Sequence, residues 1–261
     1  TWVWWSPEGR YLVVAGDRFR LWQVDGAAPR KVLEESAGVA TYDFTAGSRQ
    51  FYLIKPDRTL RLFDLPSGRL RASFPVPALP SASKAHPTRP LVALGTAEGI
   101  FLLDLAGRQR ARLPAIGHVG WVVWHPDGEM LATASLSRIV LWDVPRRRRL
   151  RVLEHECDGL SIAFSPAGDV LASQGWDGRL RLWDPRCGRP LFSTAIRPTR
   201  NSWLRFCRGN RLALAFPGSD EGGAWRLTEV VTSRTYRTLV LGPPGAGWWY
   251  GAAAVRFDGR L

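Results

Sequence analysis

Residues 160–184, LSIAFSPAGDVLASQGWDGRLRLWD, contain three short apolar runs separated by two turn sequences. The first run ends at residues 165–168 (SPAG) and the second at residues 176–178 (WDG), and both endings hold residues that favour tight turns. In the third run, RLRLW at residues 179–183, charged and apolar side chains alternate with the two-residue period of a β-strand. The stretch therefore predicts three antiparallel strands joined by two tight turns.

The same arrangement recurs along the chain with a period of about 40 residues. One marker is the large apolar residue that ends each third run, and it falls at Trp22, Phe63, Leu103, Trp142, Trp183 and Trp225. The second marker is the turn after each first run, and it falls at residues 6–9, 45–47, 86–88, 125–128, 165–168, 207–209 and 258–259. Two markers that keep one period indicate a repeat protein with six units and the start of a seventh.

The order Phe-Ser-Pro, Leu-Ala-Ser, Asp-Gly and Leu-Trp-Asp within residues 160–184 resembles the WD40 repeat. In that family each repeat forms one four-stranded blade of a β-propeller. The resemblance implies an all-β, WD40-type β-propeller with six four-stranded blades and the first strand of a seventh, which makes an incomplete ring. We expect a single domain over residues 1–261, truncated at both ends. Its predicted blades are residues 1–38, 39–80, 81–118, 119–158, 159–201 and 202–247, with a partial blade at 248–261.

In WD40 repeats the Trp that ends the third strand belongs to a hydrogen-bonded tetrad of His, Ser or Thr, Asp and Trp. The resemblance implies such a tetrad in the fifth blade, made of His155, Ser173, Asp177 and Trp183. His, Ser and Asp also make up a hydrolase triad, but their spacing here follows the blade repeat, which favours a structural role. The fourth blade keeps His118 and Trp142, while Ser137 replaces the turn Asp. We therefore predict no catalytic residues.

The chain is strongly basic, with 36 Lys and Arg residues against 23 Asp and Glu and a formal net charge of +13. Lys occurs only at positions 31, 55 and 84, so Arg carries nearly all of the positive charge. Many arginines fall in the predicted outermost strands, where charge prevents edge-to-edge association of sheets. The densest group, Arg146, Arg147, Arg148, Arg149 and Arg151, forms a basic rim that would also suit a nucleic-acid backbone or another polyanion. The sequence leaves both interpretations open.

Cys157, Cys187 and Cys207 show neither Cys-x-x-Cys spacing nor a paired His, which indicates free thiols in a reducing compartment. We accordingly predict no metal, no cofactor and a cytoplasmic protein. No apolar run reaches the roughly 18–20 residues of a membrane helix, so we expect no membrane association.

Partner-binding residues are predicted on one face of the propeller, where the loops between second and third strands meet the loops between blades. Trp176 is the strongest candidate, because a tight turn beside Asp177 places it where the blade core cannot bury it. Trp and Arg are the residue types that most often dominate binding energy. The predicted face comprises Arg58, Trp121, Trp176, Arg179, Trp203 and Trp248.

These features predict a non-catalytic protein-interaction scaffold or sensor module of a larger bacterial protein. We expect it to bind other proteins and to be monomeric when complete. The degenerate repeats with Arg-rich outer strands also resemble bacterial WD40 regions that follow serine/threonine protein kinase domains, which implies attachment to such a kinase. Two alternatives remain: a propeller that binds nucleic acid or another polyanion through its rim, and a propeller enzyme, which would need carboxylates or His converging on the central channel.

Overall fold

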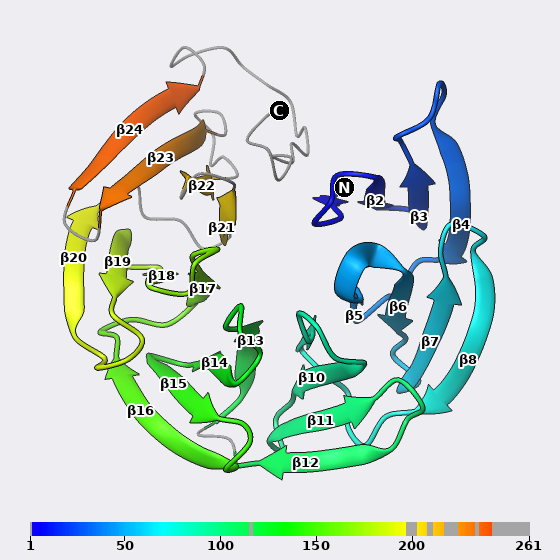
Figure 1. Cartoon of the computed structure of the whole chain (residues 1–261), viewed down its shortest axis with the longest axis horizontal. Coiled ribbons are helices and arrows are strands. Elements are labelled where there is room, and N and C mark those ends of the chain that lie inside the picture. The colour runs from blue at the N-terminus through cyan, green and yellow to red at the C-terminus, as the bar shows by residue number, and fades with distance from the viewer. Residues whose placement is uncertain are drawn as a thin grey trace. The chain divides into compact units, whose positions relative to one another are not determined.

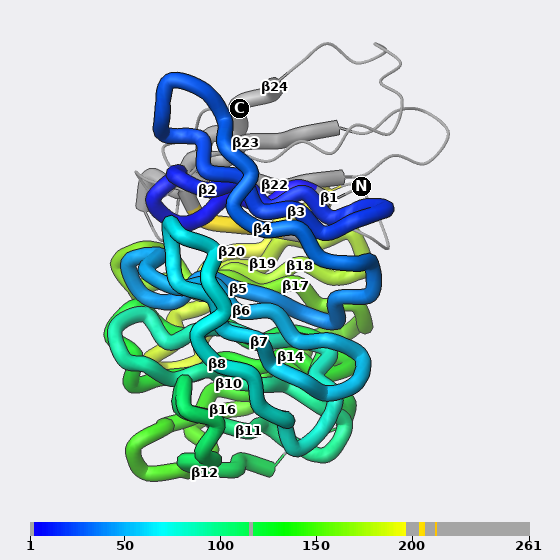
Figure 2. Tube along the Cα trace, turned by 90° about the vertical axis from the view of Figure 1, so that its right-hand side faces the viewer, coloured from blue at the N-terminus to red at the C-terminus, as the bar shows by residue number. Residues whose placement is uncertain are grey.

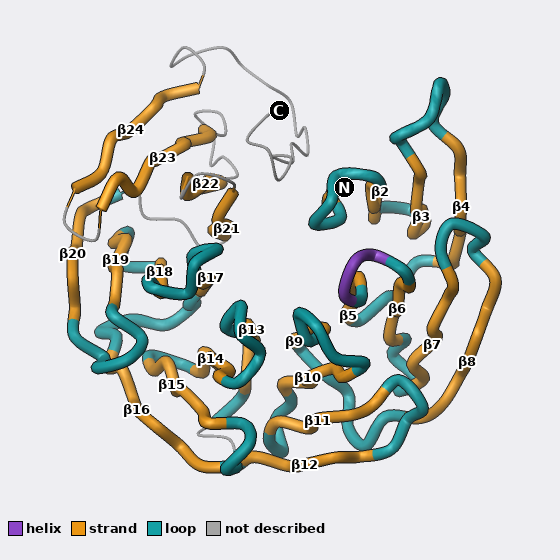
Figure 3. Tube along the Cα trace, viewed as in Figure 1, coloured by secondary structure: helices purple, strands orange, loops and turns teal. Residues whose placement is uncertain are grey.

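The computed structural model describes residues 2–114, 117–196, 203–207, 211–216, 224–232 and 235–241 of the chain. These residues form β-strands joined by short loops, together with one 3-10 helix, η1 (Ala46–Ser48), the purple segment in Figure 3. The strands make six four-stranded antiparallel sheets, which confirms the predicted all-β propeller class. Among the described residues, no helix has both the length and the apolar character needed to cross a membrane. The predicted seventh blade at 248–261 lies outside the described residues.

The chain divides into two compact units, and the first contains three sheets. Figure 2 shows them in chain order, from blue through cyan to green. In every sheet each strand pairs with the strand that follows it in the sequence, as expected for short hairpin connections. The sheets are β1 (Trp2–Trp5), β2 (Tyr11–Ala15), β3 (Arg18–Gln23) and β4 (Arg30–Ser36); β5 (Thr41–Phe44), β6 (Gln50–Ile54), β7 (Thr59–Asp64) and β8 (Arg69–Pro75); and β9 (Ala82–Ala85), β10 (Leu91–Gly95), β11 (Ile100–Asp104) and β12 (Gln109–Leu113).

The second unit also contains three sheets with the same strand order. Neighbouring sheets of this unit contact each other through their first strands, β13 with β17 and β17 with β21 (Figure 1). The sheets are β13 (Val119–Trp124), β14 (Met130–Ser135), β15 (Arg138–Asp143) and β16 (Arg148–Glu154); β17 (Ser161–Phe164), β18 (Leu171–Gln174), β19 (Arg179–Trp183) and β20 (Pro190–Ala195); and β21 (Trp203–Cys207), β22 (Arg211–Phe216), β23 (Ala224–Thr232) and β24 (Thr235–Leu241).

One irregularity repeats in five of the six sheets: the pairing of the third and fourth strands shifts directly before the marker residue. A β-bulge of this kind bends the strand and increases its twist. The third sheet has lost the aromatic marker, yet it bulges at Leu103 as its neighbours do, so the degenerate repeat still forms the same structure. The shifts occur at Leu21/Trp22, Leu62/Phe63, Leu102/Leu103, Leu141/Trp142 and Leu182/Trp183.

The sixth sheet departs from the predicted spacing. The sequence places Trp225 at the end of a third strand, but in the structure it is the second residue of β23. Trp183 pairs with Leu171 near the start of β18, whereas the matching residue of β22, Leu212, pairs with Thr228. Additional residues between β22 and β23 therefore move the marker position along the chain, and the interpretation of Trp225 as the sixth marker is wrong.

Each inner sheet buries both of its faces, because it has a neighbour on either side. In β18, Leu171 belongs to the hydrophobic cluster shared with the β13–β16 sheet, whereas Ala172 belongs to the cluster shared with the β21–β24 sheet. In β6, Phe51 and Tyr52 divide in the same way between the two flanking sheets of the first unit. Among the described residues, two such clusters in each unit fill the joints between consecutive sheets. Small residues in these clusters, such as Ala132 in the β13–β16 sheet, allow neighbouring sheets to approach each other closely.

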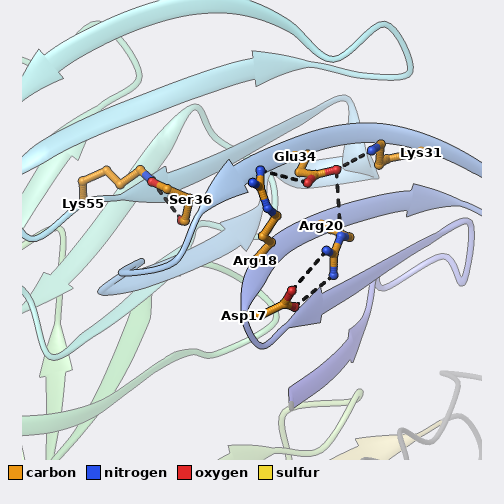
Figure 4. A network of polar contacts seen from close by, with 7 residues as sticks. All are labelled: Asp17, Arg18, Arg20, Lys31, Glu34, Ser36 and Lys55. Carbon is orange, nitrogen blue, oxygen red and sulfur yellow. Dashed lines mark hydrogen bonds and ion pairs between the residues drawn. The ribbon is translucent and has the colours of Figure 1, made fainter.

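Ion pairs and hydrogen bonds also connect β4 to neighbouring strands (Figure 4). Glu34 on β4 forms ion pairs with Arg18 and Arg20 of the adjacent strand and with Lys31, while Arg20 is also paired with Asp17. Lys55, a buried residue directly after β6, donates to the carbonyl and hydroxyl oxygens of Ser36 at 3.3 and 3.0 Å. These contacts neutralise several basic groups of the first unit within the fold.

Candidate partner-binding site

Three backbone segments of the second unit meet at one edge of the sheets β13–β16 and β17–β20. They are the turn at 136–137, the connection at 155–160 and the turn at 175–178, and we call them together the loop cluster. The backbone N–H of His155 donates to the carbonyl of Ser137 at 2.7 Å, and that of Trp176 donates to the carbonyl of Asp158 at 3.1 Å. Main-chain hydrogen bonds therefore hold the three segments as one surface.

Two large apolar side chains are exposed on this surface. Leu136 is 62% exposed and Trp176 is 45% exposed. Leu136 has a φ of 50°, in the left-handed region that costs a non-glycine residue about 1–2 kcal/mol. The indole of Trp176 lies against Gly159, since a Cβ on that glycine would be only 2.0 Å from the indole Nε1. The fold thus keeps Leu136 exposed on a strained turn and keeps the indole of Trp176 exposed against a glycine. Burial of either apolar side chain would be more favourable.

The structure distributes the predicted face between the two units. Arg58 is exposed, but it lies in the first unit. In the second unit, Arg179 is exposed beside Trp176, whereas Trp121 is half-buried and packs against a core cluster. Trp203 is the first residue of β21, its side chain is not among those described, and Trp248 lies outside the described residues. The predicted face did not include Leu136. The signal available in the sequence was a Leu at a turn position where the repeat usually has a polar residue.

Two of the predicted tetrad residues, His155 and Asp177, belong to the loop cluster, and the other two, Ser173 and Trp183, lie on the adjacent strands β18 and β19. Trp183 is buried and its indole N–H donates to Ser173 Oγ at 2.8 Å. The fourth blade contains the equivalent bond, from Trp142 to Thr133 Oγ1 at 3.0 Å. An indole N–H can only donate, so a hydroxyl facing it satisfies a group whose burial would otherwise cost stability.

An arginine joins the remaining two members of the group. Arg181 Nη2 lies 2.7 Å from the carboxylate of Asp177, and Arg181 Nη1 lies 3.1 Å from Nε2 of His155. Cys157 Sγ is 3.3 Å from Nδ1 of the same imidazole. The alternation in residues 179–183 gave no indication of this role for Arg181, because strand periodicity does not reveal how far a long side chain can reach.

These contacts set the charge of the group. Burial and then the charge of Arg181 lower the pKa of His155 to about 4, so this imidazole is neutral at physiological pH. Burial alone would raise the pKa of Asp177, but the hydrogen bonds from Arg181 and from the backbone of Arg179 hold it below its ordinary value. Burial raises the pKa of the Cys157 thiol. At neutral pH the group therefore contains one anion and one cation, with neutral imidazole and thiol groups.

The low pKa of His155 predicts a loss of stability in mild acid. In the unfolded chain His takes up a proton near pH 6.5, whereas the folded protein binds it only near pH 4. The stabilisation is therefore complete above pH 6.5 and is lost as the pH falls from 6.5 to 4. Urea midpoints measured across this range should fall in the wild type and in His118→Asn, whose exposed His is the control. A His155→Gln variant that shows the same decrease would contradict the assignment.

The basic rim is partly neutralised by the acidic residue that follows the Trp marker. Asp143 forms ion pairs with Arg146 at 3.1 Å and Arg148 at 3.3 Å, and hydrogen bonds led by the backbone of Arg146 lower its pKa. No carboxylate of the described residues lies within ion-pair distance of Arg149 or Arg151, which are both exposed. The rim therefore has a structural role in part, and some of its charge faces solvent.

Comparison with known proteins points to one repeat family. The family model named WD domain, G-beta repeat matches residues 109–143 and 147–184. The chain is 26% identical over 194 residues to Periodic tryptophan protein 2 of Arabidopsis thaliana and 30% identical over 193 residues to its homolog in Mus musculus, covering 70% and 69% of this chain. It is 28% identical over 157 residues, or 56% of its length, to Pre-mRNA-processing factor 19 of Oryza sativa subsp. japonica.

The matched regions are small parts of these relatives. The alignments cover 21% of each Periodic tryptophan protein 2 and 30% of Pre-mRNA-processing factor 19. The likeness thus concerns the repeats and not the whole relatives.

Proposed function

We propose that this chain, which carries WD40 repeats, is a non-catalytic scaffold that binds other proteins through the loop cluster of its second unit. The observation that carries the proposal is the joint exposure of Leu136 and Trp176 on turns tied together by backbone hydrogen bonds. Rigid, exposed apolar groups on a polar surface are typical of interaction sites, because a partner can bury them without first ordering the loops.

The charges around the two apolar groups are mixed. Arg138 is paired with Glu154 at 3.0 Å, Glu156 is almost fully exposed, and Arg179 lies beside Trp176. Mixed charge of this kind favours a protein partner with polar groups at its rim over a uniformly charged polymer.

The proposal is tested by affinity capture with the immobilised chain. Trp176→Ala removes the aromatic group, and Leu136→Asn removes the apolar group while keeping a residue that tolerates the left-handed conformation. Each change should lower the affinity for a specifically captured partner by about tenfold or more, as expected for residues central to an interface. The captured partner is identified by mass spectrometry, and its dissociation constant is then measured for the wild type and for each variant.

Leu70→Asn is the matched control, because Leu70 on β8 is 49% exposed but lies in the first unit. If all three variants retain the same partners at the same affinity, the loop cluster is not the binding surface. If instead Arg149→Ser and Arg151→Ser abolish capture and the affinity falls steeply with salt, the protein binds a polyanion through its rim. The exposure of those two arginines is what supports this second candidate.

The narrower parts of the proposal rest on resemblance and composition. We propose that the scaffold is a monomeric, cytoplasmic part of a larger bacterial protein and that it accompanies a serine/threonine protein kinase. The relatives named above are eukaryotic and one is named for pre-mRNA processing, so a role beside RNA-processing factors is the competing assignment. Sequencing the gene on both sides of the segment that encodes residues 1–261 distinguishes these assignments.

A further inference from the structure

A group of three potential metal ligands lies within the loop cluster. The ligand atoms of His155, Cys157 and Asp177 all lie within 4.8 Å of one another. His155 is only 2% exposed, and Cys157 and the Asp177 carboxylate are partly buried. The donors come from two backbone segments, the connection at 155–160 and the turn at 175–178, that are already held together by the hydrogen bond from Trp176 to Asp158. Nitrogen, sulfur and oxygen donors of this kind are the ligands that Zn²⁺ prefers in proteins.

We propose that His155, Cys157 and Asp177 form a zinc-binding site with a fourth position open to water. Zinc bonds of about 2.0–2.3 Å place tetrahedral donors about 3.3–3.8 Å apart. Cys157 Sγ and His155 Nδ1 are already 3.3 Å apart, and because all three ligand atoms lie within 4.8 Å of one another, the Asp177 carboxylate needs to approach by about 1 Å. A Cβ on Gly175 would lie 2.2 Å from Cys157 Sγ and 3.1 Å from Cε1 of His155, so the glycine leaves the space that the thiol occupies.

The guanidinium of Arg181 occupies the position of the metal cation in the metal-free form. It contacts both Asp177 and His155, at 2.7 and 3.1 Å. A second carboxylate, that of Glu156, lies 3.9 Å from the same guanidinium and is exposed. Arg181 can therefore turn toward Glu156 and keep an acidic partner while zinc takes its place at Asp177.

The charges balance in both forms. Without metal, the positive guanidinium offsets the Asp177 carboxylate, and the imidazole and thiol are neutral. With metal, Zn²⁺ offsets the carboxylate and the Cys157 thiolate, while Arg181 pairs with Glu156. Formation of the sulfur–zinc bond releases the thiol proton to solvent, and no oxidant or reductant is needed.

The sequence predicted that all three cysteines are free thiols. The proposed zinc site replaces that prediction for Cys157. The pattern His155-x-Cys157 with an Asp 20 residues further along the chain matches no common zinc-site spacing. The ligands become neighbours only when the hairpin between β18 and β19 folds back against the connection from β16.

The experiment is a titration of the whole chain with Zn²⁺ in competition with a chromophoric chelator, followed by Co²⁺ substitution. The wild type should take up zinc with release of one proton in weak buffer, and its cobalt form should show a thiolate-to-metal charge-transfer band. Cys157→Ala should bind zinc about 100-fold more weakly or worse, since loss of even an outer-shell partner costs about 10–100-fold. Arg181→Met should tighten binding, because it removes the competing cation.

Cys187→Ala is the control, because Cys187 is an exposed free thiol on the turn between β19 and β20. It should leave the zinc affinity, the proton release and the cobalt spectrum unchanged. Equal zinc affinity in Cys157→Ala and the wild type would overturn the proposal, as would weaker binding in Arg181→Met. Zinc uptake by the wild type without proton release would also overturn it, and that measurement does not depend on the folding of any variant. None of these results bears on partner capture by Leu136 and Trp176.

Discussion

Trp183→Ala is expected to destabilise the second unit by about 3–5 kcal/mol, the range for removal of a large aromatic side chain from a core. Trp183 is 7% exposed and packs in the hydrophobic cluster between the β13–β16 and β17–β20 sheets. Its loss leaves a cavity in that joint and removes the donor that faces the fully buried hydroxyl of Ser173. Denaturant unfolding followed by circular dichroism gives the change in midpoint.

Trp176→Ala provides the comparison for Trp183→Ala, because Trp176 has the same side-chain type and lies on the turn between β18 and β19, but is much less buried. Trp176 is 45% exposed and its indole lies against Gly159, so its removal should change the free energy of unfolding by about 1 kcal/mol, the typical value for a single substitution. Equal shifts of the denaturant midpoint in the two variants would mean that Trp183 does not stabilise the packing between the two sheets.

Gly68→Ala should strongly destabilise the first unit. Gly68 has a φ of 71°, and a Cβ there would lie 2.3 Å from the backbone oxygen of Val32 on β4. The left-handed conformation costs Ala about 1–2 kcal/mol, and forcing two packed segments apart typically costs about 1–3 kcal/mol more. The turn cannot move away freely, since Arg30 donates to the carbonyl of Pro66 at 2.9 Å. The expected loss is therefore about 2–5 kcal/mol, measured as a lower urea midpoint.

Gly47→Ala separates the two contributions. Gly47 has a similar φ of 66°, but a Cβ there would meet no atom within 4 Å. This variant should therefore show the conformational cost alone, about 1–2 kcal/mol. If Gly47→Ala and Gly68→Ala lower the midpoint equally, the contact between Gly68 and β4 contributes nothing.

The repeat was predictable because its chemistry is local. Period-two alternation, turn residues and the spacing of the Trp markers each depend on a few neighbouring residues, and five of the six markers lie at or next to the end of a third strand. Trp225 was misplaced because the connection between β22 and β23, PGSDEGG at residues 217–223, is longer than the corresponding turns and shifts the third strand along the chain. A Trp still falls close to the interval of about 40 residues, so the period alone selected the wrong residue.

The candidate sites were only partly predictable, for a different reason. Trp176 was predicted to be exposed from its turn alone, and the structure agrees. The role of Arg181 depends on where a long, flexible side chain finds a carboxylate, and the exposure of Leu136 depends on a backbone conformation that Leu seldom adopts. Both are properties of three-dimensional contacts, which hydrophobic periodicity does not encode.

The location of the hydrophobic clusters bears on how such a chain can evolve. Each cluster of the described residues is made by two sheets. A gene duplication that adds one sheet therefore adds two apolar faces, and each face needs a matching face on its new neighbour. Adjacent repeats are therefore expected to diverge in pairs, with a substitution such as Leu103 retained when the facing sheet supplies the missing volume from Tyr52 and Ile54. Selection then acts on the joint between two repeats and not on the single repeat that a sequence motif describes.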